Sequence, residues 1–301
     1  MTVIKPVEYR TQAIDSSFEA EQVQFKLWRN LSASEKELLL KRVTKRGAML
    51  ALAGIKGQFP TASKEIIRDY YIRKRLGDKW ANLLSGLKYQ GDLMIEDPIW
   101  LALELASILS SLDIMYYVGG SVASSLQGEV RLTQDLDLIA NIENSQIQPL
   151  IRAMVDQFYI SHTAVEEAVN GKTLSFNVIH LTTTEKADIF VMKDDEFSLS
   201  QMSRRVLHIG DRNKSFYICT PEDTILQKLL CFRMYNSESQ KQWRDILGVL
   251  KLQKELLDFD YLGEWGNNGA TCTSSKRIRE WIAPIFIPHF VYSVLIEKSV
   301  A

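Results

Sequence analysis

The apolar positions in the first 95 residues follow a helical spacing. The segment LSASEKELLL contains a helix start, because Ser34 and Glu37 form a capping-box pattern just before a run of apolar residues. A second helix is predicted to follow it and to stop at Gly77, since glycine is the usual residue after a helix C-terminus. Residues 1–95 are therefore expected to form a small helical unit.

Beyond Pro98 the pattern changes to short apolar runs separated by helical segments. The runs are rich in β-branched and aromatic residues, which predicts strands. The predicted strands lie at residues 114–118, 135–140, 174–181, 187–192, 204–209 and 216–218. The predicted helices between them lie at residues 100–112, 122–126 and 146–157.

From Pro221 onward the spacing of apolar residues is helical again. The predicted helices lie at residues 222–235, 240–256, 260–266 and 274–281. The expected fold class is α+β, with a mixed sheet and flanking helices, a small N-terminal helical unit and a C-terminal helical region. The expected domains are a basic helical region at residues 1–95, an α/β core at 96–220 and a helical region at 221–301.

Charge is distributed less evenly than the total of −1 suggests. Residues 26–79 carry eight Lys and six Arg against five acidic residues, a net charge of +9, which leaves −10 for the rest of the chain. A basic helical unit of this kind could bind an RNA acceptor electrostatically. It could equally be a cationic face that docks onto the acidic remainder of the same chain.

The cysteines and the apolar segments bear on the compartment. Cys219, Cys231 and Cys272 have no CxxC spacing, so neither a disulfide framework nor a zinc site is indicated. The N-terminal stretch MTVIKPVEYRTQ lacks the apolar core of a signal peptide. The most apolar segment, residues 98–118, contains two acidic residues and predicts a buried helix and strand rather than a membrane span. A cytoplasmic protein is expected.

The stretch VGGSVASSLQGEVRLTQDLDLI, residues 118–139, places a Gly-Gly-Ser turn ahead of two aspartates. Residues two apart on a strand point to the same face, so Asp135 and Asp137 are expected to project together. Adjacent carboxylates repel each other, and a hard divalent ion such as Mg²⁺ relieves that repulsion. Asp188 begins another predicted strand, and three carboxylates at one sheet face suit two-metal phosphoryl or nucleotidyl transfer. The alternative is a solvent-exposed strand edge where the aspartates are merely hydrated.

The Gly-Gly-Ser turn has the features of a phosphate-binding turn. Gly119 and Gly120 permit backbone geometry that other residues resist, and they let the chain approach a ligand closely. Ser121 opens a helix whose free N–H groups and positive dipole end favour an anion. Such a turn is also a common strand-to-helix connection. The interpretation as a phosphate-binding turn therefore depends on its position before the two aspartates.

Together these segments resemble the signature of the nucleotidyltransferase (polymerase β-like) superfamily. The matching segments are VGGSVA at 118–123, RLTQDLDL at 131–138 and ADIF at 187–190. The RLTQDLDL form is similar to that of the AbiEii-type toxin nucleotidyltransferases of toxin–antitoxin and abortive-infection systems, which also carry a downstream Lys and an Asp on the next helix. Here PEDTILQKLLCFR supplies Lys228 and WRDIL supplies Asp245.

The resemblance implies roles for residues between 114 and 256, about half of the chain. The implied metal site binds Mg²⁺, with two ions expected, and its ligands would be Asp135, Asp137 and Asp188. The implied catalytic residues are Asp135, Asp137, Asp188, Lys228 and Asp245. The implied nucleotide-binding residues are Gly119, Gly120, Ser121, Arg131 and Thr133. Within these sets, Lys228 would reach the phosphates, and Asp245 would orient Lys228 or an acceptor.

Some of these residues have simpler alternatives. Arg131 and Thr133 are expected to brace the loop before the strand, with a nucleotide or acceptor contact as the other possibility. Lys228 and Asp245 could instead lie on a solvated helix face.

The leading hypothesis is a Mg²⁺-dependent nucleotidyltransferase that moves an NMP from an NTP to an acceptor, with pyrophosphate leaving. The acceptor could be a tRNA end or other RNA, a protein hydroxyl or a small molecule. A toxin-like role and an antitoxin partner follow from the resemblance alone, and no membrane partner is expected. The alternatives are a catalytically silent nucleotide-sensing or interaction module, and an RNA- or DNA-binding protein that acts through the basic N-terminal helices.

Overall fold

The computed structural model describes residues 11–13, 15–86, 93–234 and 239–267. They form two compact units. The first, here called the sheet unit, comprises residues 33–126 and 130–220. The second, here called the helical unit, comprises the described residues up to 32, residues 127–129 and the described residues from 221 onward.

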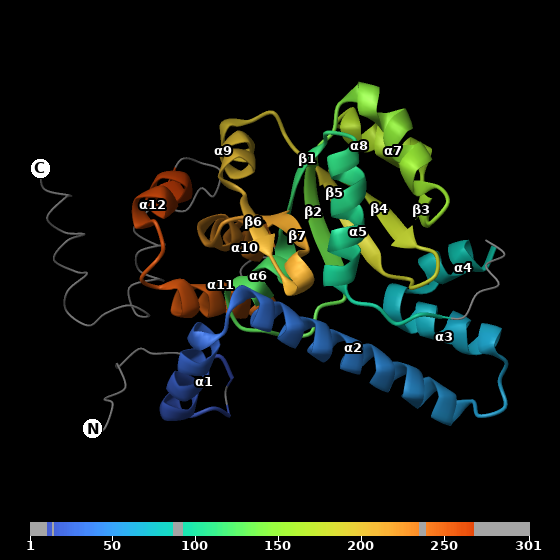
Figure 1. Cartoon of the computed structure of the whole chain (residues 1–301), viewed down its shortest axis with the longest axis horizontal. Helices are drawn as coiled ribbons and strands as arrows, with labels where there is room; N and C mark the ends of the chain where they lie inside the picture. Colours follow the sequence, from blue (N-terminus) through green and yellow to red (C-terminus); the bar gives the residue numbers. More distant parts are fainter. Residues whose placement is uncertain (1–10, 14, 87–92, 235–238, 268–301) are drawn as a thin grey trace, which may run out of the picture. The chain divides into compact units, whose positions relative to one another are not determined.

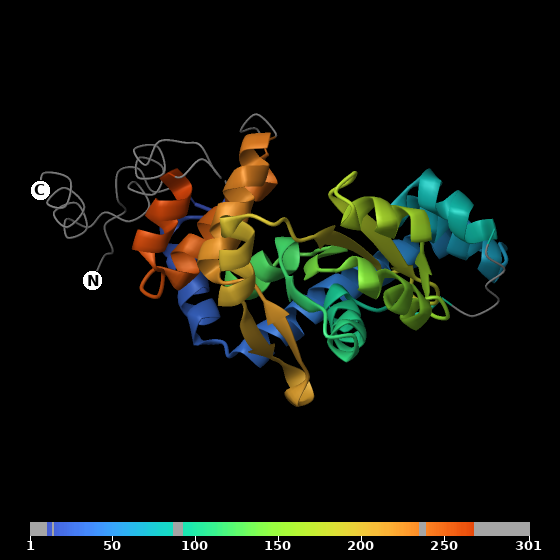
Figure 2. The same ribbon diagram turned by 90° about the horizontal axis from the view of Figure 1, so that it is seen from above.

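The sheet unit is built around a seven-stranded mixed sheet with the strand order β3-β4-β5-β2-β1-β7-β6. The strands are β1 Met115–Val118, β2 Asp135–Asn141, β3 Phe158–Ile160, β4 Ser175–His180, β5 Lys186–Val191, β6 Val206–Ile209 and β7 Ser215–Ile218. Two neighbouring pairs, β2 with β5 and β1 with β7, are parallel, and the other pairs are antiparallel. Figure 2 shows the β6–β7 hairpin projecting from one end of the sheet. The predicted α+β class is confirmed.

Helices surround this sheet. They are α2 Ala33–Gln58, α3 Lys64–Leu76, α4 Asp78–Gly86, α5 Pro98–Ser111, α6 Gly120–Gln127, α7 Ile147–Met154, α8 His162–Val169 and α9 Glu196–Arg204. Figure 1 shows α5 crossing the face of β2 and β5, and α3 lying beside α4. No described helix combines the length and apolar character that crossing a bilayer requires.

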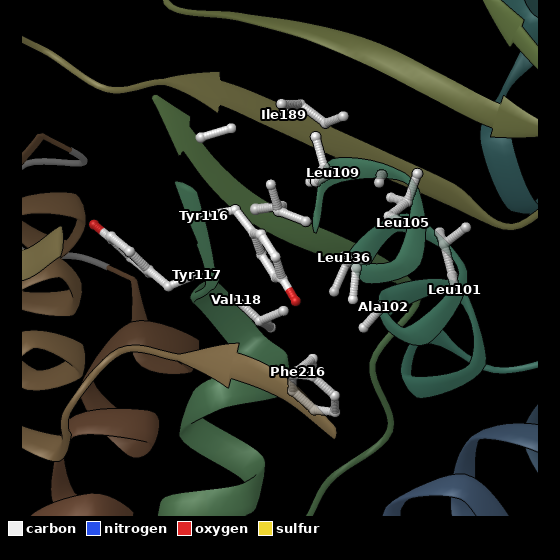
Figure 3. Close-up of a cluster of buried hydrophobic side chains, with 14 of the residues drawn as sticks. Leu101, Ala102, Leu105, Leu109, Tyr116, Tyr117, Val118, Leu136, Ile189 and Phe216 are labelled. Carbon is white, nitrogen blue, oxygen red and sulfur yellow. The ribbon is translucent and has the colours of Figure 1, made fainter. Parts of the chain in front are cut away.

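The core lies between α5 and the sheet. Leu101, Leu105 and Leu109 recur every four residues along α5 and are fully buried. They point toward the strands, where Leu136 and Ile189 meet them (Figure 3). Each such side chain contributes roughly 1.5–3 kcal/mol when it leaves water. One face of β2 and β5 is thereby committed to the core, which leaves the other face for polar side chains.

The basic helices pack within the sheet unit, so the structure divides the chain differently from the predicted plan. Leu40 of α2 joins the core cluster of the sheet. The ammonium group of Lys45 lies 2.6 Å from a carboxylate oxygen of Glu96, and Arg75 lies 2.5 Å from Glu185. These pairs join basic residues of the segment 26–79 to acidic residues outside it. They favour the docking alternative for Lys45 and Arg75, and RNA binding by this segment stays a prediction.

The helical unit contains α1 Phe18–Asn30, α10 Pro221–Met234, α11 Gln240–Gln253 and α12 Phe259–Asn267. Its N-terminal helix joins the later helices through buried charge. The ammonium group of Lys251 lies 2.6 Å from Glu21, and Arg29 donates a hydrogen bond to the carbonyl of Lys251. The periodicity of apolar residues could not predict this partner, because periodicity carries no long-range information.

Local signals placed most helix ends close to their observed positions. Ser63 accepts a hydrogen bond from the N–H of Ile66 at the start of α3, and Gly77 ends that helix with φ +87°. Ser34 lies inside α2 rather than at its cap, because α2 begins at Ala33. The short elements α4, β3, α8 and α9 were not predicted, and the predicted helix at 274–281 lies outside the described residues.

Candidate active site

The acidic face of β2 lies opposite the core. Leu136 and Leu138 are fully buried against α5 and its neighbours, while Asp135 and Asp137 alternate with them on a half-exposed face. This is the arrangement that the spacing D-L-D-L predicts on a strand. Neither carboxylate is sealed inside the protein, so both can meet a ligand from solvent.

Strand pairing brings a third carboxylate to the same face. In the parallel pair of β2 and β5, Asp137 lies opposite Asp188 and Asp135 lies opposite Lys186. On the other side of β5, the antiparallel β4 places Asn177 opposite Asp188. Residues that face one another across a register share a sheet face. The predicted proximity of Asp188 to the Asp-x-Asp pair is therefore a consequence of the register.

Lys186 is a polar residue of this face that the sequence analysis did not single out. Its ammonium nitrogen lies 3.0 and 2.9 Å from the two carboxylate oxygens of Asp188 and 3.7 Å from an oxygen of Asp135. The amide of Asn177 also donates to Asp188. The signal was present in the sequence K-A-D, because a residue two positions before Asp188 on a strand shares its face.

The chemistry of the donor set fits Mg²⁺. Carboxylate oxygens are the ligands that this ion prefers, and three of them stand on adjoining positions of two neighbouring strands. The ammonium group of Lys186 already lies between Asp188 and Asp135, so the cluster attracts positive charge. Among the described residues, no three His, Cys, Asp or Glu side chains are gathered as a metal ion would require. The assignment of Asp135, Asp137 and Asp188 as ligands stays a prediction.

The Gly-Gly-Ser turn is joined directly to the acidic face. The N–H of Gly119 donates to the carbonyl oxygen of Asp137 at 3.0 Å. Gly120 begins α6 with φ +58°, and a Cβ atom placed on it would lie 1.8 Å from Oδ2 of Asp137. Glycine is thus required at position 120 both for backbone conformation and for space. The turn is therefore in direct contact with Asp137.

Two hydroxyl groups brace the loop before β2. Ser121 and Thr133 are both buried, and their hydroxyl groups hydrogen-bond to each other. The hydroxyl of Thr133 also donates to the carbonyl of Asp135 at 3.4 Å, and Arg131 donates to the carbonyl of Leu132 at 3.2 Å. Thr133 thus ties the loop to the start of α6, whereas the cited bond of Arg131 is local to its own neighbour. The bracing role of Arg131 stays a prediction. Contact of Ser121, Arg131 or Thr133 with a nucleotide stays a prediction.

Lys228 and Asp245 meet each other inside the helical unit. The ammonium nitrogen of Lys228 on α10 lies 2.9 Å from a carboxylate oxygen of Asp245 on α11. The two side chains are only 7% and 3% exposed, which excludes the alternative of a solvated helix face. Asp245 therefore forms an ion pair with Lys228. The catalytic roles of both residues, and the contact of Lys228 with phosphate, stay predictions.

A buried ion pair anchors α3 beside the loop that leads into β2. Glu185 is fully buried and pairs with Arg75, which also donates to the carbonyl of Gln134 at 3.3 Å. Burial raises the pKa of Glu185 to about 7, although the guanidinium group of Arg75 opposes this shift. Arg75 thus connects the helix to the residue directly before Asp135.

The raised pKa of Glu185 gives the stability a pH dependence that can be measured. From its unfolded pKa of 4.5 up to its folded pKa of about 7, the folded chain keeps a proton that the unfolded chain releases. This contribution to stability is complete below 4.5 and is lost as the pH rises through 7. Urea unfolding measures the free energy of unfolding at about pH 5 and at about pH 8. Between these two pH values it should fall by roughly 2 kcal/mol more in the native chain than in Glu185→Gln.

The exposed carboxyl of Glu196 provides the control for this measurement. Glu196→Gln should keep the pH dependence of the native chain, because that side chain is solvated at the start of α9. Equal pH dependence in the native chain and in Glu185→Gln would show that Glu185 titrates normally.

Comparison with known proteins gives structural neighbours of low similarity. No family model and no curated protein matches the chain. An antigenic nucleotidyltransferase-like protein of Paracoccidioides brasiliensis is 17% identical, with a TM-score of 0.43 over 61% of this chain and 88% of that one. A putative nucleotidyltransferase of Thermotoga maritima is 15% identical, with a TM-score of 0.34 over 52% of this chain and 98% of that one. Because these scores are low, the function proposed below rests on the residues of this chain.

Proposed function

We propose that the chain is a Mg²⁺-dependent nucleotidyltransferase that transfers an NMP from an NTP to an acceptor. The observation that carries the proposal is the connection of the Gly-Gly-Ser turn to Asp137, which in turn lies in register with Asp188. A turn that allows close approach of phosphate and a face of three carboxylates are the two parts that nucleotidyl transfer needs.

The chemistry divides between the metal and the residues of the chain. When bound to Asp135, Asp137 and Asp188, Mg²⁺ would supply positive charge to the phosphate oxygens. The backbone N–H groups at the start of α6 would bind the phosphates. Asp188, which Lys186 and Asn177 hold in place, is the proposed acceptor of the proton from the attacking hydroxyl. The acceptor oxygen forms a bond to the α-phosphorus. The bond between the α-phosphorus and the oxygen that bridges to the β-phosphate breaks, and pyrophosphate leaves.

Loss of the carboxylates should abolish transfer. The full chain incubated with Mg²⁺, labelled NTPs and cell RNA or lysate should give labelled product. Asp135→Asn and Asp137→Asn should each reduce the rate by about 1000-fold or more, because each removes charge that neutralises the metal and orients the phosphates.

The matched control is Asp156→Asn. Asp156 is an exposed aspartate that follows α7 in the same unit, away from the acidic face, so its replacement should leave the rate unchanged. Absence of label with every NTP and every acceptor fraction would contradict the proposal. Calorimetry that shows NTP·Mg²⁺ binding without any product would then favour the silent nucleotide-sensing module.

The acceptor class and the biological role are part of the proposal. We propose RNA, such as a tRNA end, as the acceptor, supported by the excess of basic residues between 26 and 79. The toxin-like role and the antitoxin partner are supported only by the RLTQDLDL form of the motif at residues 131–138. Label that appears in protein rather than in RNA would redirect the acceptor without affecting the transfer reaction.

A further inference from the structure

Lys186 places a positive charge between two carboxylates of the acidic face. Its side chain is only 14% exposed, whereas those of Asp135 and Asp188 are 48% and 22% exposed. Its ammonium nitrogen lies 2.9 Å from an oxygen of Asp188 and 3.7 Å from an oxygen of Asp135. The strands fix this position, because Lys186 lies opposite Asp135 in the register and two residues before Asp188. The ammonium group is therefore a permanent part of the acidic face.

Donors from the protein already occupy most of the carboxylate of Asp188. Lys186 donates to both of its oxygens, and the amide of Asn177 donates to Oδ1. A carboxylate offers about four acceptor positions, so about one position remains on Asp188. Asp188 can therefore provide an oxygen to one metal ion at most.

The charge of the acidic face also matches a single divalent ion. Three carboxylates and one ammonium group carry a net charge of −2 in the chain without a bound nucleotide. One Mg²⁺ neutralises this charge, and a second ion would then approach a face that no longer attracts it. Without the ammonium group the three carboxylates would carry −3, and they would still attract a second ion after binding the first.

We propose that Lys186 takes the place of one of the two metal ions that the resemblance to nucleotidyltransferases implies, so that the site binds a single Mg²⁺. In two-metal sites the ions stabilise both the attacking and the leaving oxygens. Lys186 contacts Asp188, the proposed proton acceptor, so its charge belongs to the side of the attacking hydroxyl. Asp137 contacts the turn proposed to bind the phosphates. The inference rests on the proposed function and deepens it, because it gives the number of ions and the electrostatic role of Lys186.

The test is the number of Mn²⁺ ions that the full chain binds, measured from the EPR signal of free Mn²⁺. This ion takes the same oxygen ligands as Mg²⁺. Ions that Asp135→Asn combined with Asp137→Asn no longer binds are counted as bound by the acidic face. The native chain should bind one such ion, and Lys186→Met, which removes the charge but keeps a long side chain, should bind two. Two such ions in the native chain would overturn the proposal.

Two variants control for the loss of a lysine. Lys186→Arg keeps a cation at the same position and should bind one Mn²⁺ at the acidic face. Lys193→Met removes an exposed lysine beyond the end of β5 and should also bind one. Urea unfolding checks that Lys186→Met is folded. A folded Lys186→Met that binds only one ion, or a second ion in either control, would show that the charge of Lys186 does not set the number of ions.

Transfer of labelled NMP separates this inference from the proposed function. At a Mg²⁺ concentration that saturates the native chain, Lys186→Met should transfer about 100-fold more slowly, because a positioned charge is lost. Part of the rate should return when Mg²⁺ is raised, since a second ion then supplies the charge. One Mn²⁺ in the native chain and two in Lys186→Met, without transfer by either, would keep the assignment of Lys186 while the proposed function fails. Transfer by a native chain that binds two ions would do the opposite.

Discussion

Replacing Gly120 by alanine is expected to reduce nucleotidyl transfer about 100-fold or more. The added Cβ would fall 1.8 Å from Oδ2 and 2.7 Å from Cβ of Asp137, so the aspartate must move away from the turn. A displacement of about 1 Å in a catalytic group costs on the order of 100-fold in rate. Transfer of labelled NMP, together with urea unfolding, measures the effect.

The stability of Gly120→Ala should also fall, by about 3 kcal/mol. The left-handed backbone conformation at φ +58° contributes about 1–2 kcal/mol of this loss, and the steric conflict contributes the rest. Gly171→Ala separates the two causes, because Gly171 has φ +73° and open space around its Cβ position. It should lose about 1–2 kcal/mol and keep full activity. Equal activity in the two variants would contradict the close contact between the turn and Asp137.

Replacing Lys228 by methionine is expected to destabilise the chain by about 3–5 kcal/mol and to abolish transfer. Asp245 would be left nearly buried without its ion-pair partner, and an uncompensated buried charge is costly. The lost transfer follows from the proposed contact of Lys228 with phosphate. Urea unfolding and NMP transfer at one pH give the two values.

A second substitution separates stability from function at this pair. Lys228→Met combined with Asp245→Asn removes both charges, so most of the lost stability should return while transfer stays absent. Recovery of transfer along with stability would show that Lys228 acts only as a structural partner of Asp245.

Lys186 gives the acidic face a property that three aspartates alone would lack. Its ammonium group, close to Asp188 and Asp135, offsets the repulsion between these carboxylates in the protein alone. Lys186 lies on the same strand as Asp188 and contacts it, and Asp188 is the proposed proton acceptor. Asp137, on the neighbouring strand, contacts the turn instead. The acidic face thus combines a fixed cation with the carboxylates proposed to bind Mg²⁺.

Local sequence determined the parts of this protein that depend on neighbouring residues. Alternation of charged and apolar residues fixes Asp135 and Asp137 on one face of β2, because side chains on a strand repeat every two residues. The left-handed turn at Gly120 follows from glycine's lack of a Cβ, and the α3 helix ends at Gly77 for the same reason. The sequence therefore predicted the α+β class and the shared face of Asp135 and Asp137, but not the presence of Lys186 beside them.

Only the tertiary structure decided which distant residues meet. The register of β2 with β5 brings Asp188 to Asp137 and Lys186 to Asp135, and a shift of one residue would have turned both away. Burial left the Thr44 hydroxyl without a hydrogen-bond partner among the described residues, although nothing in its neighbouring residues distinguishes it. Strand register and burial depend on contacts between segments far apart in the chain. Periodicity and local spacing do not encode these contacts. The contacts are what bring the residues of the motif together.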